Sequence, residues 1–255
     1  MDIFKSSDPR RIELPGRVLV AHQAEFMPWL GFISKAAMGD IFLIHDDTQF
    51  KKKYFENRNK VRFPNQDGWI WLNIPVKNNH RFPNMLEVEI ADDKWIDKHL
   101  STLKNSYAHA PYFDVIFPEL EQIYHRFNSN KLVEFNIMII KYAFKKFYIN
   151  IPVKRVSELK EADKIREQQG TEMVISLLKA TFAQTVVVGV TGRNYLVKSR
   201  FEQENLDVVY QDFKHPEYHQ IHKGFLPYMS FIDLIFNYST DDAINILGKS
   251  NYKFL

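Results

Sequence analysis

The sequence predicts an α/β protein with a mostly parallel sheet, and three observations carry this prediction. Two apolar runs, Val18–Ala21 and Ile41–Ile44, flank a helical pattern, which is the order of a strand–helix–strand unit with parallel strands. The same order returns later, where the run Thr185–Val188, a helical pattern and the run Leu206–Tyr210 follow one another. Between the two units, residues 92–148 have helical patterns, so we expect a helical insert within one sheet.

The other elements before and within the insert follow from periodicity. A strand is expected at Gly68–Val76, which is rich in Trp and Ile, and a half-exposed strand at Met85–Ile90, where apolar and acidic residues alternate. The helices of the insert, each with apolar residues at helical spacing, are expected at 92–103, 111–127 and 131–148. Pro118 is expected to kink or split the second of them.

After the insert the chain returns to alternation of strands and helices. Ser230 and Asp233 fit a helix cap with a displaced partner, which accounts for both residues. The remaining expected elements are a strand at Ile151–Leu159 and helices at Thr171–Phe182, Asn194–Glu204, Ser230–Asn237 and Asp241–Leu247. The chain then divides into an N-terminal half of the α/β domain at 17–91, the helical insert at 92–148 and a C-terminal half at 149–255.

The bulk composition limits the classes of protein that fit. With 255 residues, of which 45% are hydrophobic, the chain can bury a substantial core. A net charge of +3 is too small to indicate nucleic-acid binding by itself, and the absence of cysteine excludes disulfides, thiol catalysis and cysteine-based zinc sites. The first residues lack the apolar core of a signal peptide, and no stretch approaches the roughly 20 apolar residues that span a bilayer, so we expect a cytoplasmic protein without a membrane span.

Polar side chains follow the first two predicted strands, at the point where each strand ends. Because ligands bind at the carboxyl ends of parallel strands, we expect these side chains to share one crevice. An imidazole or a carboxylate can take a proton from a substrate, so His22, Asp46 and Asp47 are the candidate catalytic residues. The groups that follow the first strand are His22, Gln23 and Glu25, and those that follow the second are His45, Asp46, Asp47 and Gln49.

Each of these groups also has an ordinary structural explanation. A histidine at a strand end can bond to the backbone, and paired acids such as Asp46 and Asp47 commonly lie on loops. In a site, paired carboxylates can hold Mg²⁺ or orient an amine, and their repulsion can raise the pKa of one of them. The position of His22 across the expected crevice favours the site.

A basic stretch follows the second strand. The planar fork of Arg58 matches carboxylate or phosphate, and the amides of Asn57 and Asn59 add donors and acceptors beside it. Lys52 and Lys53 lie just before them, so this stretch would attract an anionic substrate such as a phosphate. The alternatives are a solvated edge and a helix or loop start that is capped by asparagine.

Two later motifs are less specific. Gly189 and Gly192 precede Tyr195 at the predicted strand-to-helix turn and would let backbone N–H groups approach an anion, but their spacing matches neither the dinucleotide fingerprint nor the P-loop. The stretch 215–222 holds three histidines, yet its proline and alternating pattern indicate an extended segment, so no metal site is assigned. Nucleophile-elbow and metalloprotease motifs are absent.

A set of short motifs runs through the chain from 18 to 238. They are His22-Gln23, Pro28-Trp29 with Gly31, Asp46-Asp47-x-Gln49, Asn57-Arg58-Asn59, Trp71-Leu72-x-Ile74-Pro75-Val76, Gly192-x-x-Tyr195-Leu196, His215-Pro216-x-Tyr218-x-Gln220, Phe225-x-Pro227 and Ser230-x-x-Asp233-Leu234. Together they resemble the WbqC-like family of bacterial surface-polysaccharide gene clusters. Ala24 departs from the proline that the family usually has after His-Gln, which frees a backbone angle and leaves the polar groups in place.

The resemblance implies a cytoplasmic enzyme that decorates amino sugars or related precursors of O-antigen and capsule. Acylation of a sugar amine by an amino acid such as glycine is the reaction it favours. In such an enzyme Arg58, with Lys52 or Lys53, would bind phosphate. The other expected substrate contacts are Gln23, Glu25, Gln49, Asn57, Asn59, Gly192, Tyr195, His215, Tyr218 and Gln220.

The opening of the chain has a second, fainter likeness. A strand, then Phe26-x-Pro28-Trp29-Leu30-Gly31-Phe32, a helix and a strand is similar to the start of HIGH-motif nucleotidylyltransferases and pantothenate synthetases. That likeness implies a Rossmann-like, HIGH-superfamily-like sheet and nucleotide chemistry at the first helix. Trp29 and Phe32 replace the two histidines that stabilise the transferred phosphoryl charge in those enzymes. Either His22 and the basic residues near 51–58 take over that work, or the fold remains without the nucleotide chemistry.

The leading hypothesis is an amide-forming transferase or ligase that acts on a free or nucleotide-linked amino sugar. The base would be His22 or one of the pair Asp46 and Asp47. The activated donor is open among an adenylate made from ATP with Mg²⁺, an acyl carrier and an aminoacyl-tRNA. The alternatives are a non-catalytic protein that binds a nucleotide sugar or a partner, and a nucleotidyltransferase that lacks the usual motif histidines.

Overall fold

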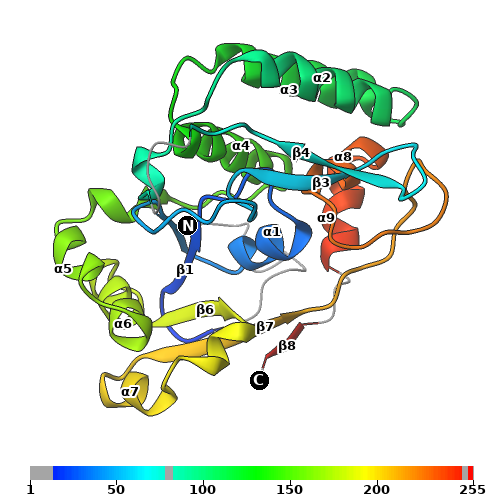
Figure 1. Cartoon of the computed structure of the whole chain (residues 1–255). Coiled ribbons are helices and arrows are strands. Elements are labelled where there is room, and N and C mark those ends of the chain that lie inside the picture. Colours follow the sequence, from blue (N-terminus) through cyan, green and yellow to red (C-terminus); the bar gives the residue numbers. More distant parts are fainter. Residues whose placement is uncertain (1–13, 78–82, 249–251, 255) are drawn as a thin grey trace.

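A central parallel sheet organises the molecule. The structure is a computed structural model, and it describes residues 14–77 and 83–248 and the backbone of 252–254. The parallel strands are β1 (Val18–Gln23), β2 (Ile41–His45), β5 (Val153–Arg155), β6 (Thr185–Gly189) and β7 (Asp207–Phe213). With β8 (Tyr252–Phe254) antiparallel at one edge, the strand order is β5-β2-β1-β6-β7-β8 (Figure 1). Helices flank this sheet, so the predicted α/β fold with a mostly parallel, Rossmann-like sheet is confirmed.

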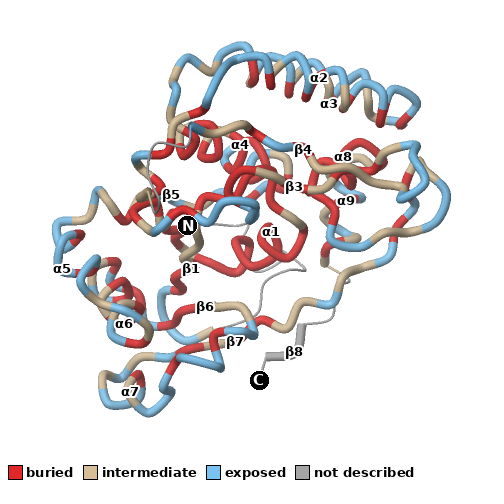
Figure 2. Tube along the Cα trace, in the orientation of Figure 1, coloured by how far each residue is buried: buried red, intermediate tan, exposed pale blue. Residues whose placement is uncertain are grey.

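The central strands are apolar because both faces of the sheet are covered. Along β1, alternate residues enter two separate apolar clusters, as the strand's period of two requires. Val20 packs in one cluster with α1 (Leu30–Ala37), whose eight residues are all buried (Figure 2). Leu19 packs in the other cluster with α6 (Gly170–Ala180). The strand–helix–strand unit predicted at the start of the chain is therefore the centre of the fold.

The helical middle of the chain forms three helices. They are α2 (Lys94–Tyr107), α3 (Phe113–Arg126) and α4 (Leu132–Lys146). Pro118 lies inside α3, which is continuous, so of the two expected effects the splitting of the helix does not occur. In α4, the ring of Phe144 packs edge-on 5.1 Å from that of Phe42 in β2, so this helix covers the sheet. No helix in the described ranges is long and apolar enough to cross a membrane.

A separate antiparallel hairpin lies beside the main sheet. Its strands are β3 (Arg58–Arg62) and β4 (Trp69–Asn73), and Figure 1 shows it between the pair α2 and α3 and the helix α1. β4 was expected within Gly68–Val76. β3 was missed, because its sequence RNKVR carries one apolar residue and gives no strand signal.

The strand expected at Met85–Ile90 is wrong. The chain there makes a 3₁₀ turn, η1 (Met85–Glu87), and its pairing is limited to two isolated bridges, from Glu89 to Lys131 and from Ile90 to Val76. Asn84 explains the difference, because its side chain accepts from the backbone N–H of Leu86 while Glu87 accepts from that of Asn84. This capping box fixes a turn in spite of the alternating pattern.

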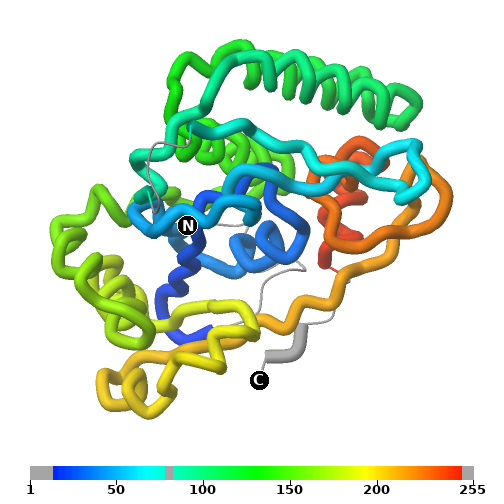
Figure 3. Tube along the Cα trace, in the orientation of Figure 1, coloured from blue at the N-terminus to red at the C-terminus, as the bar shows by residue number. Residues whose placement is uncertain are grey.

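The C-terminal half follows the predicted order with shorter helices. The helix expected at Asn194–Glu204 is confirmed only over Lys198–Gln203, and a 3₁₀ segment that ends at Asn194 precedes it. The remaining elements are η2 (Val156–Glu158), α5 (Ala162–Arg166), η3 (Val190–Asn194), α7 (Lys198–Gln203), α8 (Phe231–Asn237) and α9 (Thr240–Gly248). Between β7 and α8 the chain has no regular element and runs beside the β3–β4 hairpin (Figure 3).

Ser230 and Asp233 have different roles, although the sequence pairs them as a cap. Ser230 does cap α8, since its hydroxyl accepts from the backbone N–H of Ile232. Asp233 is fully buried and accepts instead from the hydroxyls of Tyr107 and Tyr218, each at 2.9 Å. The acid is thus the centre of a buried network that joins α2 to α8.

His99 should make the fold sensitive to acid. Its ring joins α2 to the carbonyl of Asn73 and the hydroxyl of Tyr124, and burial lowers its pKa to about 4. The unfolded chain therefore binds a proton at higher pH than the folded one, and stability is lost as the pH falls from about 6.5 towards 4. Between pH 7 and pH 5 the free energy of unfolding, measured in urea, should fall by about 2 kcal/mol more in the wild type than in His99→Gln. Parallel losses in the two proteins would contradict this.

Candidate functional site

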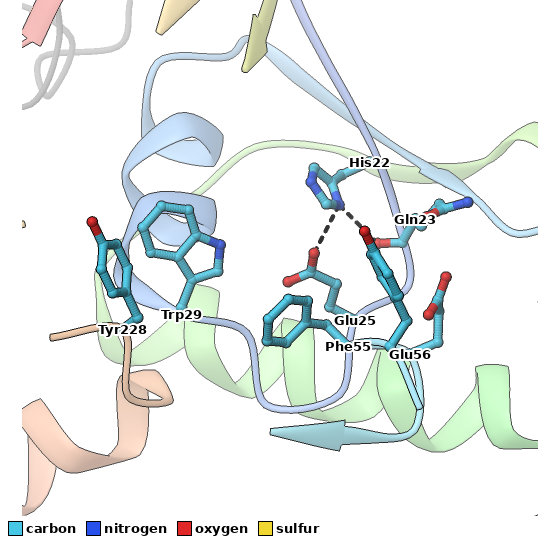
Figure 4. Close-up of a pocket in the computed structure, with 8 residues that line it drawn as sticks. His22, Gln23, Glu25, Trp29, Phe55, Glu56 and Tyr228 are labelled. Atoms are coloured by element: carbon cyan, nitrogen blue, oxygen red, sulfur yellow. Dashed lines mark hydrogen bonds and ion pairs between the residues drawn. The ribbon is translucent and has the colours of Figure 1, made fainter. Parts of the chain in front are cut away.

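A cavity of about 430 Å³ opens at the carboxyl end of β1. The residues that line it come from β1 and the loop after it, from the turn before β3 and from the segment before α8. They are His22, Gln23, Glu25, Trp29, Tyr54, Phe55, Glu56 and Tyr228 (Figure 4). Three of them, His22, Gln23 and Glu25, are groups that the sequence predicted for this place. A cavity therefore lies at the place where the sequence predicted a site, after the first strand.

The cavity has an aromatic side and a polar side. Figure 4 shows Trp29 and Tyr228 together on one side, with ring centroids 5.6 Å apart, and Phe55 near the middle. His22 and Glu25 face each other across the polar wall, where His22 Nδ1 lies 3.7 Å from Glu25 Oε1. A ligand held here would meet flat apolar rings and ionisable groups together.

Two buried asparagines hold the loop that carries Glu25. Asn59 donates to the carbonyls of Phe26 and Met27, at 3.2 and 2.8 Å. Asn136 of α4 donates to the carbonyls of Ala24 and Glu56, each at 2.7 Å. Because buried carbonyls outside regular structure need donors, these amides fix the path of both lining segments.

The backbone around the cavity is strained at three positions. Met27, Lys53 and Tyr228 have φ values of 43°, 65° and 61°, in the left-handed region that residues other than glycine rarely adopt. Tyr228 lines the cavity, Lys53 directly precedes the lining residue Tyr54, and Met27 lies on the loop between Glu25 and Trp29. Such strain persists only where surrounding contacts impose it, and it is concentrated at functional sites.

Burial sets the protonation of the polar wall. It raises the pKa of Glu25 to about 8, and Glu56 acts in the same direction while the charge of Lys35 opposes both. Burial also lowers the pKa of Lys35 to about 8, against the effect of Glu25. The pKa of His22 lies well below its usual value because of burial and the charge of Lys35, so its imidazole is neutral at neutral pH. This group of side chains can therefore exchange a proton near neutral pH.

Carboxylate oxygens on the cavity wall lack hydrogen-bond partners within the described ranges. They are Oε2 of Glu25 and both side-chain oxygens of Glu56. Glu25 is 9% exposed and Glu56 is 3% exposed, and burial raises the pKa of Glu56 as well. Buried acceptors without donors are costly, so these oxygens mark where a ligand with N–H or O–H groups would bind.

Asp46 does not reach the cavity. It is fully buried, and its oxygens accept from Arg155 at 2.6 Å and from the backbone N–H and hydroxyl of Ser157 at 3.0 and 2.7 Å. These bonds tie the end of β2 to the segment after β5. The predicted catalytic role of Asp46 therefore lacks a place at the cavity.

Asp47 is also held by neighbours. Burial alone would raise its pKa, but hydrogen bonds and charges from His45 and Arg166 hold that pKa below its usual value. Its two oxygens lie 3.3 Å from His45 Nε2 and 3.3 Å from Arg166 Nε.

Among the described residues no group of three or more histidines and acids is placed to hold a metal ion.

The predicted residues of 49–59 have several different environments. Asn57 and Asn59 are buried and bond to protein carbonyls, and Arg58 stacks on Trp71 with 4.0 Å between its guanidinium carbon and the ring centroid. Lys52 and Lys53 lie on an exposed turn, and Gln49 is exposed with a backbone bridge to residue 84. Of this set, Asn57 and Asn59 serve the scaffold of the site, and none lines the cavity.

The predicted C-terminal contacts also lie behind or away from the cavity. Tyr218 and Gln220 are buried and donate to Asp233. Gly192 packs under Val188 and Tyr210, and Tyr195 is largely exposed. His215 stands next to the cavity, with its ring 5.5 Å from that of Tyr228.

Sequence reasoning missed Lys35 and most of the aromatic wall. A usable signal existed for Lys35, because the helix LGFISKAA is apolar on every side and must therefore bury its one charge. Tyr54, Phe55 and Glu56 stand between the basic run and the Asn57 motif and carry no pattern of their own. Tyr228 lies far along the chain, and only the bonding of that segment to β3 and to the Trp29 loop brings it here.

Asn136→Ala should destabilise the protein and loosen the site. The substitution leaves the buried carbonyls of Ala24 and Glu56 without donors, and each costs about 1–3 kcal/mol. We expect a loss of roughly 3 kcal/mol in the free energy of unfolding, measured in urea. Asn150→Ala, at an exposed position, is the control and should change little. An equal loss in both variants would show that the amide of Asn136 is not the cause.

Gly31 and Trp29 should be energetically coupled. A Cβ at position 31 would lie 2.2 Å from the indole of Trp29, so the ring rests in space that only glycine leaves open. We expect Gly31→Ala to lower the free energy of unfolding by about 1–3 kcal/mol in the wild type and by much less in a Trp29→Leu background. A double-mutant cycle in urea measures this, and equal costs in both backgrounds would contradict it.

Comparison with known proteins places these observations in one family. A sequence model of the WbqC-like protein family matches residues 23–245. The protein Rv1507c of Mycobacterium tuberculosis (strain ATCC 25618 / H37Rv), whose name assigns no function, is 27% identical over 217 residues, which cover 84% of this chain and 91% of that protein. No solved structure matches significantly. The match takes in the cavity residues from Gln23 to Tyr228, and the chain therefore belongs to the WbqC-like protein family.

Proposed function

We propose that the cavity binds an amino sugar and that the protein forms an amide on the amine of that sugar. The observation that carries the proposal is the set of buried carboxylate oxygens on Glu25 and Glu56 that have no donor within the described ranges. An ammonium group offers the N–H donors and the positive charge that these oxygens lack. The rings of Trp29 and Tyr228 give the apolar side on which a sugar ring can pack.

Glu25 is the base in this proposal. An amine attacks an acyl carbon only after losing its extra proton, and a base works best when its pKa lies near the working pH. Glu25 takes the proton as the C–N bond forms, and the bond between the acyl carbon and its leaving group breaks. This moves the base from the predicted His22 and aspartates to the acid beside them.

His22 and Lys35 support this chemistry from the protein side. The ring of His22 is held by a 3.2 Å hydrogen bond between its Nδ1 and the carbonyl of Gln23, which leaves it 3.7 Å from Glu25 Oε1. Lys35 supplies a nearby charge that favours the ionised carboxyl of Glu25. The donor is proposed as an activated acyl or aminoacyl group such as glycyl, from an adenylate made with ATP and Mg²⁺, from an acyl carrier or from an aminoacyl-tRNA.

The role in the cell is proposed from the family. Amide formation on an amino sugar would serve the assembly of surface polysaccharides such as O-antigen and capsule, and the enzyme would act in the cytoplasm. A binding protein without catalysis is the second candidate. Its supporting observation is that two of the three predicted catalytic residues, Asp46 and Asp47, are paired with Arg155 and Arg166 and do not line the cavity.

Binding of a cationic amino sugar should strengthen as the pH rises from 6 to about 8. Glu25 carries a proton below its pKa of about 8, and the ammonium binds the ionised form, so affinity follows the loss of that proton. Glu25→Gln should bind at least tenfold more weakly at pH 7.5 and should lose the pH dependence. Calorimetry with glucosamine checks this, and the N-acetylated sugar should bind without the same pH dependence.

The control is Glu121→Gln, on the exposed side of α3, which should bind as the wild type does. Turnover is measured separately, by mass spectrometry of a UDP- or dTDP-linked amino sugar with ATP and glycine. An amide product that is absent from Glu25→Gln supports the enzyme, and binding without any product supports the binding protein. Equal affinity for glucosamine in the wild type and Glu25→Gln would end the proposal.

A further inference from the structure

The outward face of the β3–β4 hairpin carries two cations stacked on two indoles. We call Arg58, Lys60, Trp69 and Trp71 the hairpin face. Arg58 lies 4.0 Å from the ring centroid of Trp71, and Lys60 lies 4.2 Å from that of Trp69. Asn59 and Leu72, which alternate with them in the strands, are buried, whereas the four residues of the hairpin face are half-buried, so this face is the more exposed side of the hairpin.

The hairpin face is continuous with the cavity. Phe55 lines the cavity, and its ring centroid lies 6.3 Å from that of Trp71. Trp71 lies 5.5 Å from Trp69 in turn, with the two rings nearly perpendicular. On the cavity side, the ring of Tyr54 lies 5.9 Å from that of Phe55. A row of rings therefore leads from the cavity along the hairpin.

The cations of the hairpin face have no acid beside them within the described ranges. Arg155, Arg166 and Arg200 all form ion pairs with carboxylates, whereas Arg58 and Lys60 have their rings as charge partners. The Nε of Arg58 is buried without a hydrogen-bond partner. A guanidinium and an ammonium left in this state are suited to the oxygens of phosphate groups.

We propose that the hairpin face binds the nucleoside diphosphate part of a nucleotide-linked sugar whose sugar lies in the cavity. Arg58 and Lys60 would hold the diphosphate, and the base would pack against Trp71 and Trp69 on the parts of the indoles that the two cations leave uncovered. The assignment of the sugar rests on the proposed function, but the hairpin face itself can be tested with a nucleotide that has no sugar. Arg58, which the sequence predicted to bind phosphate, would then do so outside the cavity.

The ordinary explanation of the hairpin face is that cation–ring pairs stabilise the hairpin. A purely structural role predicts that Arg58→Gln lowers stability and leaves nucleotide binding as it was. A ligand-binding role predicts that Arg58→Gln weakens nucleotide binding. Unfolding in urea is therefore measured for every variant together with binding.

The experiment titrates the wild-type protein with UDP, uridine and inorganic pyrophosphate by calorimetry. We expect UDP to bind at least tenfold more tightly than uridine or pyrophosphate, because both halves of the hairpin face contribute. Arg58→Gln and Lys60→Gln should each weaken UDP binding at least fivefold and leave glucosamine binding unchanged. Lys154→Gln on β5, an exposed residue far from the hairpin in sequence, has the same loss of charge and should bind UDP as the wild type does.

The results distinguish this proposal from the proposed function. If UDP does not bind, or binds equally to Arg58→Gln and Lys154→Gln, the hairpin site is overturned whatever happens with glucosamine. If Glu25→Gln binds glucosamine like the wild type while Arg58→Gln loses UDP, the hairpin site stands and the amine site fails. Pyrophosphate that binds as tightly as UDP overturns the stacking of the base. A single-stranded RNA oligonucleotide that binds more tightly than UDP overturns the choice of ligand.

Discussion

The hydrogen bonds from Asn59 and Asn136 are the constraint on which the site depends. The segment between β1 and α1 is buried, yet it has no regular structure to pair its carbonyls. Asn59 comes from the hairpin and Asn136 from α4, so two elements outside the sheet determine where Glu25 stands. The same amide of Asn136 also holds Glu56, so both acids of the cavity are positioned by one side chain.

A second buried network fixes the far wall of the cavity. Arg62 of β3 bonds to Gln220 and to the carbonyl of Gly224, and Gln220 bonds to Asp233. These contacts attach the irregular segment before α8 to the hairpin, and Tyr228 lies on that segment. Gln220, which the sequence suggested as a ligand contact, thus has an indirect role: it holds the segment that places Tyr228 at the cavity. Their buried polar groups have partners inside the protein, which makes them weak candidates for direct contact.

The sequence predicted the sheet and the first half of the site for one physical reason. A strand–helix–strand unit places ligands at the carboxyl end of its strands, and the cavity lies at that end of β1. The same rule misplaced Asp46, because Arg155 approaches from β5, a pairing that local periodicity does not encode. Glu56 and Tyr228 could not be predicted, since their positions depend on contacts between segments far apart in the chain. The hairpin strand β3 was not predicted for a related reason. Its residues are mostly polar, and they form a strand because they pair with the β4 segment that contains Trp69 and Trp71.

The packing of the Trp29 indole over Gly31 has a consequence for how this family can vary. The indole occupies the space above the first turn of α1, where a side chain at position 31 would otherwise stand. A substitution at either position alone would disturb the packing, so positions 29 and 31 should vary together among family members. In lineages where a larger residue replaces the glycine, a smaller one should stand in place of the tryptophan, and the shape of the cavity beside it should change with them.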